Sequence, residues 1–295
     1  MTKKRFNLRN VIAIALCLTV SATIFAQETG VVINGVKWAT RNLDVGGKFV
    51  TNEGGISILF QWGRPADGHE SRTGGGSLTN GTTTILSTTD VPAHGKFITV
   101  SSSPYDWRIP QNDALWNTGT EDTPVKSAND PSPSGWRVPT HTEFKSLLDE
   151  TKVSREYVKE GGWFIGIRFT DITGTGTNGN SVFFPTTGYI NCENGNFYGG
   201  NDGYYWSSTP SGTRAYILSC QSNDANWFTR DRANAHSIRP VADEGNVGIN
   251  TISSDTENAV VIGYFDMLGR KLPEEPKQGL YIIRYSNGTA KKVMR

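Results

Sequence analysis

The first quarter of the chain alternates between apolar and polar positions in a way that predicts short β-strands. Residues 31–43 alternate, and the Asn-Gly pair at 34–35 is a dipeptide that tight hairpin turns prefer. Residues 54–62 hold a second run of bulky apolar side chains and predict another strand. The segment that follows, 63–90, is rich in Gly, Ser, Thr and Asn, so we expect a long surface loop there.

A short pattern occurs twice and introduces the two helices that we expect. In both copies Trp-Arg is followed by an aliphatic residue and Pro, beginning at Trp107 and at Trp136. After the second copy, Thr140 and Glu143 match the capping box that begins a helix, and apolar residues follow at helical spacing. We expect a shorter helix at 112–117, after the first copy.

From residue 161 to residue 243 the pattern is that of a β protein. Residues 163–169 alternate so that the four odd-numbered positions, all bulky and apolar, share one face of a strand. Runs of Gly and Asn supply the turns. The sequence therefore predicts an α+β fold with few short helices and many short antiparallel strands. Further strands are expected at 181–189, 204–208, 214–220 and 236–241.

Both ends of the chain differ from the large domain between them. Residues 1–26 have a basic head and an uncharged apolar run, which is a signal-peptide pattern and too short to span a bilayer comfortably. No other long apolar stretch occurs, so no membrane span is expected after its removal. Residues 244–256 predict a linker, and 257–295 predict a small all-β module. Its expected strands are 259–266, 280–285 and 290–294.

The net charge limits which partners are expected, and the number of cysteines suggests a disulfide. The formal net charge is +1, which favours neither nucleic acid nor an anionic membrane as a partner. Without residues 1–26, two cysteines remain, Cys192 and Cys220. An exported protein meets oxidising conditions, so we predict a disulfide between them. Two buried free thiols are the alternative.

Several aromatic-rich motifs follow one another between residues 31 and 243. They are Trp-Ala-Thr-Arg-Asn-Leu at 38–43, Phe-Gln-Trp-Gly-Arg at 60–64, Tyr-Asp-Trp at 105–107, Asp-Pro-Ser-Pro-Ser-Gly-Trp-Arg-Val-Pro-Thr at 130–140, Phe-Pro-Thr-Thr-Gly-Tyr at 184–189, Gly-Tyr-Tyr-Trp-Ser-Ser at 203–208 and Ser-Ile-Arg at 237–239. In this order, the set resembles the Fibrobacter succinogenes major paralogous domain family.

That resemblance implies an exported surface protein whose fold is akin to C-type lectin-like and formylglycine-generating-enzyme-like domains. The family has no established common activity. Its members often carry cysteines where this chain has Ser132 and Pro240, so a bridge between these two points is not expected here.

The end of the chain carries a second resemblance. Asp-Met-Leu-Gly-Arg-Lys at 266–271 is followed by Gly-Leu-Tyr-Ile-Ile-Arg-Tyr at 279–285 and a short basic segment. This resembles the C-terminal sorting domain of the type IX secretion system. The resemblance implies that the secretion machinery is a partner, and that the domain ahead of this module works outside the cell, secreted or at the outer cell surface.

No residue pattern predicts a catalytic or metal site. The four histidines, at 69, 94, 141 and 236, lie at no metal-ligand spacing, and we expect them on the surface or in loops. There is no Gly-x-Ser-x-Gly elbow, and neither Cys192 nor Cys220 has the basic neighbours that activate a thiolate. We therefore predict no cofactor, no metal and no enzyme activity.

Aromatic side chains are the strongest indication of a ligand, because their faces stack on sugar rings. Arg64 is a candidate to bind a carboxylate, and its alternative role is to donate hydrogen bonds to loop carbonyls. Trp227 is the tryptophan most expected in a loop. The alternative for each ring is burial in the core. The predicted ligand-binding residues are Trp62, Arg64, Trp107, Trp163, Tyr204 and Trp227.

These observations predict a secreted or cell-surface, non-catalytic module that recognises a glycan or a surface protein through aromatic-rich loops. One alternative is a structural or adhesin subunit of a surface assembly, of the pilus accessory type. The other is an unrecognised hydrolase, which would need two carboxylates that converge in a cleft.

Overall fold

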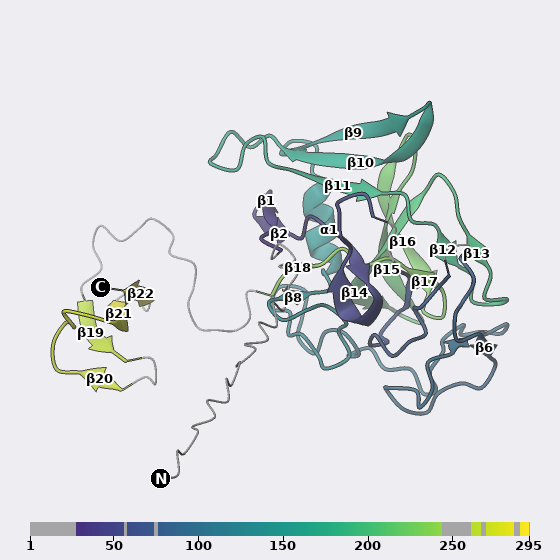
Figure 1. The fold of residues 1–295 in the computed structure, drawn as a ribbon, viewed down its shortest axis with the longest axis horizontal. Helices are drawn as coiled ribbons and strands as arrows, with labels where there is room; N and C mark the ends of the chain where they lie inside the picture. The colour runs from purple at the N-terminus through teal and green to yellow at the C-terminus, as the bar shows by residue number, and fades with distance from the viewer. Residues whose placement is uncertain are drawn as a thin grey trace, which may run out of the picture.

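In the part that the structure describes, the chain folds into many short, mainly antiparallel sheets and one short α-helix, as a computed structural model shows (Figure 1). A mostly β architecture with a single helix agrees with the predicted scarcity of helices. The structure describes residues 28–55, 58–73, 76–243, 261–266, 270–285 and 290–294. The predicted signal peptide at 1–26 and linker at 244–256 lie outside the described residues. No helix in the described part of the chain is long and apolar enough to cross a membrane.

The first sheet joins the two ends of the large domain. Its hairpin turn has Asn34 at φ 45° and Gly35 at φ 81°, the two positive angles that a type I′ turn requires. The hairpin predicted at 31–43 is therefore confirmed. Strands in this sheet follow the order β1 (Val31–Ile33), β2 (Val36–Trp38), β18 (Val241–Ala242) and β8 (Trp136–Arg137).

In the second sheet, the buried face of residues 163–169 differs from the one predicted. A β-bulge between Phe164 and Gly166 inserts one extra residue, so the buried side changes from even to odd positions. Phe164, Ile167 and Phe169 are buried, whereas Trp163 is exposed. The strand order is β11 (Ser181–Pro185), β10 (Trp163–Asp171) and β9 (Val153–Glu160), and the sequence pattern had not indicated β9.

The third sheet lies between two hydrophobic clusters. In its middle strand, Ile217 packs into one cluster and the next residue, Leu218, packs into the other. Because successive side chains of a strand point to opposite faces, the middle strand is covered by core on both faces. The strand predicted at 214–220 is confirmed. The order is β14 (Gly203–Ser211), β15 (Arg214–Cys220) and β16 (Ala225–Asp231).

A fourth sheet places Tyr189 and His236 on neighbouring strands. The strand predicted at 236–241 is split between this sheet and the first one, and the strand predicted at 54–62 is confined to two residues. The order is β13 (Phe197–Tyr198), β12 (Tyr189–Ile190), β17 (Ala235–His236) and β5 (Phe60–Gln61). Smaller elements are β3 (Leu43–Asp44), the 3-10 helix η1 (Val45–Gly47), β4 (Lys48–Phe49), β6 (Thr82–Thr83) and β7 (Phe97–Ile98).

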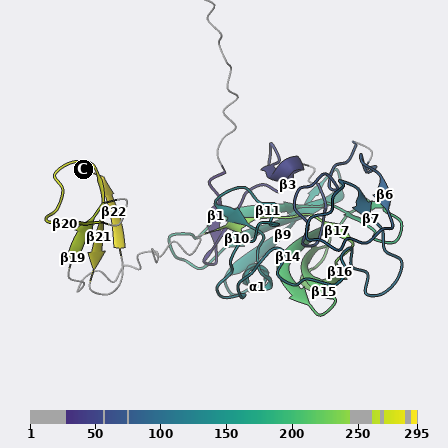
Figure 2. The ribbon, with the colours of Figure 1, turned by 90° about the horizontal axis from the view of Figure 1, so that it is seen from below.

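The helix α1 (His141–Leu147) begins as predicted, with a complete capping box. Glu143 N donates to the Thr140 hydroxyl, and Thr140 N donates to the Glu143 carboxylate at 2.7 Å. Phe144 and Leu147 face the core, and α1 packs beside β14 and β15 (Figure 2).

The shorter helix predicted at 112–117 is absent: a turn at 113–114 and bends at 115–116 occupy these residues, and Asn117 forms an isolated bridge. Gln111 takes the position in the first copy that Thr140 has in the second. Its amide does not cap a helix and instead donates to the Asp106 carboxylate at 2.9 Å. Ala114 occupies the position of the capping glutamate, so neither half of a capping box is present.

Arg239 connects distant parts of the domain from a fully buried position. Its guanidinium donates to Asn42 Oδ1 at 2.6 Å, to Ala39 O at 3.1 Å and to Phe183 O at 2.8 Å. It also lies 4.8 Å from the centroid of the Phe184 ring. Burial lowers the pKa of Arg239 to about 10, so the group stays charged at neutral pH.

The predicted disulfide between Cys192 and Cys220 is not formed. Both cysteines are free and buried, and each packs into a different hydrophobic cluster, on opposite sides of the third sheet. The alternative of two buried thiols therefore describes the structure. Burial raises the pKa of both thiols, that of Cys192 to about 11.

The C-terminal module forms a four-stranded antiparallel sheet. It contains the three strands predicted at 259–266, 280–285 and 290–294, and one additional short strand. The turn at 286–289 lies outside the described residues. The order is β20 (Lys271–Leu272), β19 (Val261–Phe265), β21 (Leu280–Tyr285) and β22 (Ala290–Met294).

Replacing Arg239 should destabilise the domain strongly. We expect Arg239→Met to lower the free energy of unfolding by about 3 kcal/mol or more, because three buried acceptors lose their donor. Urea denaturation of the chain lacking residues 1–26 measures this. Arg214→Met is the matched control, since its side chain is 50% exposed, and it should cost less than about 1 kcal/mol. Equal losses in the two variants would contradict the role given to Arg239.

The two thiols should both react once the chain is unfolded. Iodoacetamide in concentrated guanidinium chloride, without reductant, should add two labels to the chain lacking residues 1–26, and mass spectrometry counts them. The folded chain should label slowly, because both thiols are buried and their pKa values are raised. Labelling that requires prior reduction would show that a disulfide exists after all.

Candidate functional site

A small polar pocket lies where the third and fourth sheets meet. The two sheets are joined by backbone hydrogen bonds, from Ser237 N to Tyr204 O at 3.0 Å and from Trp206 N to Ser237 O at 2.9 Å. This contact brings β12, β14, β16 and β17 together around a cavity of about 290 Å³. The cavity is lined by Tyr189, Asn191, Tyr204, Arg230, Asn234 and His236.

His236 forms part of the wall of this pocket and is only 1% exposed. Neither ring nitrogen has a hydrogen-bond partner among the described residues. The imidazole packs 4.5 Å from the Trp206 ring and 5.6 Å from the Tyr204 ring, centroid to centroid. Burial, with a smaller contribution from the charge of Arg230, holds the pKa of His236 well below its usual value. The ring is therefore neutral, with one N–H donor and one acceptor nitrogen.

Two unpaired nitrogens on a buried ring are unusual. A buried polar group without a partner costs about 1–3 kcal/mol, and native proteins rarely keep one without a reason. A ligand in the pocket would supply the missing partners. His236 is therefore the feature that marks this cavity as a candidate binding site.

Arg230 reaches the same pocket from β16. Its Nη1 donates to Thr229 O at 3.2 Å, and its guanidinium lies 5.9 Å from the Phe228 ring centroid. Among the ion pairs of the described residues, none involves Arg230; its neighbours Arg214 and Arg232 are both paired. The pocket thus contains a cation without a carboxylate partner.

Two tyrosines give the pocket aromatic walls and hydroxyl groups. Tyr204 donates its hydroxyl to Asp202 at 3.0 Å, and burial with this neighbour raises the pKa of Tyr204 to about 12. Burial also raises the pKa of Tyr189. Tyr189 stacks on Tyr198 at 5.2 Å, and the Tyr198 side chain is 44% exposed at the outer end of the pair. Both phenols lining the pocket remain protonated at neutral pH.

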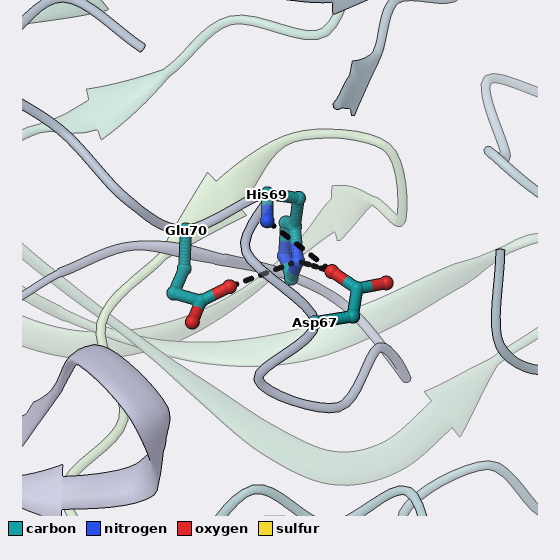
Figure 3. A group of neighbouring side chains, drawn as sticks. All are labelled: Asp67, His69 and Glu70. Atoms are coloured by element: carbon teal, nitrogen blue, oxygen red, sulfur yellow. Dashed lines mark hydrogen bonds and ion pairs between the residues drawn. The ribbon is translucent and has the colours of Figure 1, made fainter. Parts of the chain in front are cut away.

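A second polar cluster, Asp67, His69 and Glu70, has the residue types of a metal site (Figure 3). His69 Nε2 accepts from Gln61 N at 2.9 Å, so Nδ1 carries the hydrogen and donates to Asp67 Oδ1 at 2.7 Å. The other Asp67 oxygen is held by Arg64 at 2.6 Å.

These contacts leave no nitrogen of His69 free to bind a metal, and a cation would compete with the guanidinium of Arg64. Glu70 is also engaged, because its carboxylate accepts from Gly68 N at 2.8 Å. Burial and the charge of Arg64 lower the pKa of His69 to about 4. We interpret this cluster as a structural anchor for the loop that begins at residue 63.

Three of the residues predicted to bind ligand are in the core. Trp62, Arg64 and Trp107 are fully buried, and their polar groups are used internally. Trp62 Nε1 donates to Ser207 O at 2.8 Å, and Trp107 Nε1 donates to Trp62 O at 2.7 Å. Arg64 donates to Lys96 O at 3.0 Å, which is the alternative role that we gave it. None of the three offers a face to a ligand in this structure.

The two remaining tryptophans are exposed but far apart in the fold. Trp163, at the start of β10, is 69% exposed. Trp227 is 42% exposed and lies in β16, so its placement in a loop was wrong. Its ring contacts His141 and Tyr216 at 4.9 and 5.6 Å between centroids. The predicted residues therefore do not form one stacking face, and Tyr204 alone among them lines the pocket.

Sequence reasoning missed the residues that define the pocket. The expectation that all four histidines lie on the surface or in loops was wrong for His141 and His236, which are buried in α1 and β17. His69 is also buried, but it lies in a turn of the predicted loop. Residues 225–231 do not alternate between apolar and polar types, so a period-two pattern does not reveal β16 or place Arg230 on a strand face. No local pattern shows that β12 and β17 meet β14, at the other edge of the sheet that contains β16.

No family model, curated protein or solved structure matches this chain.

The histidine in the structural anchor should make stability depend on pH. Because the pKa of His69 falls from 6.5 to about 4 on folding, the unfolded chain binds the proton more readily. Stability should then decrease as the pH falls from about 6.5 to about 4, by up to roughly 3 kcal/mol from this residue. Urea denaturation across this pH range should show a shallower loss for His69→Gln than for the unmodified chain. Identical pH profiles would contradict this assignment.

Proposed function

We propose that this chain is an exported, non-catalytic binding protein, and that the domain at 31–243, lectin-like in its fold, holds a glycan in the pocket around His236. The observation that carries this proposal is a buried imidazole with two unpartnered nitrogens, facing a cavity with aromatic walls. Export is supported by the sequence patterns at the two ends of the chain, which resemble a signal peptide and a sorting domain.

The composition of the pocket suits a sugar. A pyranose ring has apolar C–H faces that pack on aromatic rings, and Tyr189 and Tyr204 meet edge to face at 5.7 Å to form such a corner. Sugar hydroxyls both donate and accept, which matches the amides of Asn191 and Asn234 and the neutral His236. A cavity of about 290 Å³ is small for a binding pocket and fits a single ring.

Binding is better supported than hydrolysis. A glycosidase needs two carboxylates on either side of the scissile bond, and the six residues that line the pocket include none. Asp202 is near, but its carboxylate accepts the Tyr204 hydroxyl. The hydrolase alternative therefore has no pair of acids at this site.

A specific observation also favours the adhesin alternative. β16 is an edge strand in the order of the third sheet, and it exposes Trp227 and Phe228 next to each other. An edge strand with exposed aromatic residues is a template for pairing with another chain. A surface assembly could use this edge while the pocket remains available.

A glycan-array screen tests the proposal. The chain lacking residues 1–26 should bind a subset of glycans saturably. Tyr189→Ala should weaken that binding about tenfold, because it removes one aromatic wall that contributes about 1.4 kcal/mol.

Trp163→Ala is the matched control, since Trp163 is an exposed aromatic residue on another sheet and should leave binding unchanged. Binding that is lost in the Trp163 or Trp227→Ala variant but kept in Tyr189→Ala would place the site elsewhere. Absence of any glycan binding, together with co-purification in a surface fibre, would favour the adhesin alternative.

A further inference from the structure

We infer that the pocket selects an acidic sugar, a pyranose that carries a carboxylate, with that carboxylate bound by Arg230 and His236. This inference rests on the proposed function and gives it a ligand class.

The charge of the pocket favours an anion. Arg230 is the cation among the six lining residues, and no carboxylate lines the cavity with it. The remaining polar groups are neutral amides, protonated phenols and a neutral imidazole. A neutral ligand that filled the cavity would take water away from the guanidinium and give it no counter-charge. A carboxylate supplies that charge, and the planar guanidinium binds it with two parallel hydrogen bonds.

The acids next to the pocket already have partners. Asp202, which precedes β14, accepts the hydroxyl of Tyr204 at 3.0 Å and is not among the residues that line the cavity. Asp231, which follows Arg230 in β16, pairs with Arg214 at 2.8 Å. No ion pair joins Asp202 to Arg230, although many carboxylates of the described residues do pair with arginine. The guanidinium thus remains available to an incoming acid.

His236 distinguishes a sugar acid from a simple inorganic anion. A neutral imidazole offers one donor and one acceptor, and both of its nitrogens lack a partner here. An acidic sugar presents an acceptor, the carboxylate, and neighbouring hydroxyls that donate. Sulfate would use the donor but leave the acceptor nitrogen facing negative oxygen, and phosphate, which can donate through a P–OH group, has no ring for the aromatic walls. The aromatic corner of Tyr189 and Tyr204 then packs against the ring that carries both groups.

A purely structural role does not account for His236. An apolar ring of similar size would fill the same space beside Trp206 without burying two unpaired nitrogens. We therefore expect His236→Phe to fold with unchanged or higher thermal stability and to lose affinity for the acidic sugar. A change that removes binding without reducing stability is the behaviour of a ligand-binding residue.

Titration calorimetry with matched sugar pairs tests the inference. The probes are the methyl glycosides of glucuronic, galacturonic and N-acetylneuraminic acid, with methyl glucoside and methyl galactoside as the neutral counterparts and acetate as a carboxylate without a ring. At least one acidic glycoside should bind tenfold or more tightly than its neutral counterpart and than acetate. Arg230→Gln should remove that difference, whereas Arg214→Gln, which loses the same charge outside the pocket, should preserve it.

The outcomes separate this inference from the proposed function. Neutral glycosides that bind as tightly as acidic ones, with no effect of Arg230→Gln, would overturn the acidic class and leave a glycan site in place. Acetate that binds as tightly as the acidic glycosides would show a plain anion site and overturn the sugar class. If no glycoside binds and the array shows no ligand, both proposals fail. Should His236→Phe not fold, the Arg230→Gln result decides alone.

Discussion

The large domain depends on buried guanidinium groups that supply hydrogen bonds to a chain with little regular structure. Short strands and long loops leave many backbone carbonyls without a partner in a sheet, and each buried carbonyl needs a donor. Arg239 meets this need for segments near residues 39–42 and at Phe183, which are far apart in the sequence. Arg64 and Arg232 do the same for other loops, with Lys96 O and Gly212 O among their acceptors. Such groups are costly to bury, but their five donors can bind several loops at once.

The position of the candidate site follows from this arrangement. Three residues before Arg239, His236 lies on β17, and Ser237 between them joins the third and fourth sheets through backbone hydrogen bonds. A segment anchored on both sides cannot easily move to give the imidazole new partners within the protein. The pocket is therefore formed before any ligand arrives, which reduces the entropy lost on binding.

Two buried histidines show how the same residue type takes different roles. His69 has a partner on each ring nitrogen, and its neighbours Asp67 and Gln61 complete a closed network. His236 is as deeply buried and has no partner on either nitrogen. Burial makes both rings neutral, so charge does not distinguish them. What distinguishes them is whether their nitrogens have hydrogen-bond partners, which indicates a structural role for His69 and supports the proposed binding role of His236.

The sequence by itself determined the features that depend on a few neighbouring residues. The Asn-Gly pair at 34–35 decided the first hairpin, Thr140 and Glu143 decided where α1 begins, and a run of apolar residues indicated β15. Only the tertiary structure decided which rings are buried, that a bulge in β10 changes its buried face, and that Arg230 and His236 share a pocket. Turn and cap geometry are set by local sterics and short-range hydrogen bonds. Burial and the convergence of side chains depend instead on contacts between strands that are distant in the chain, and no local pattern encodes them.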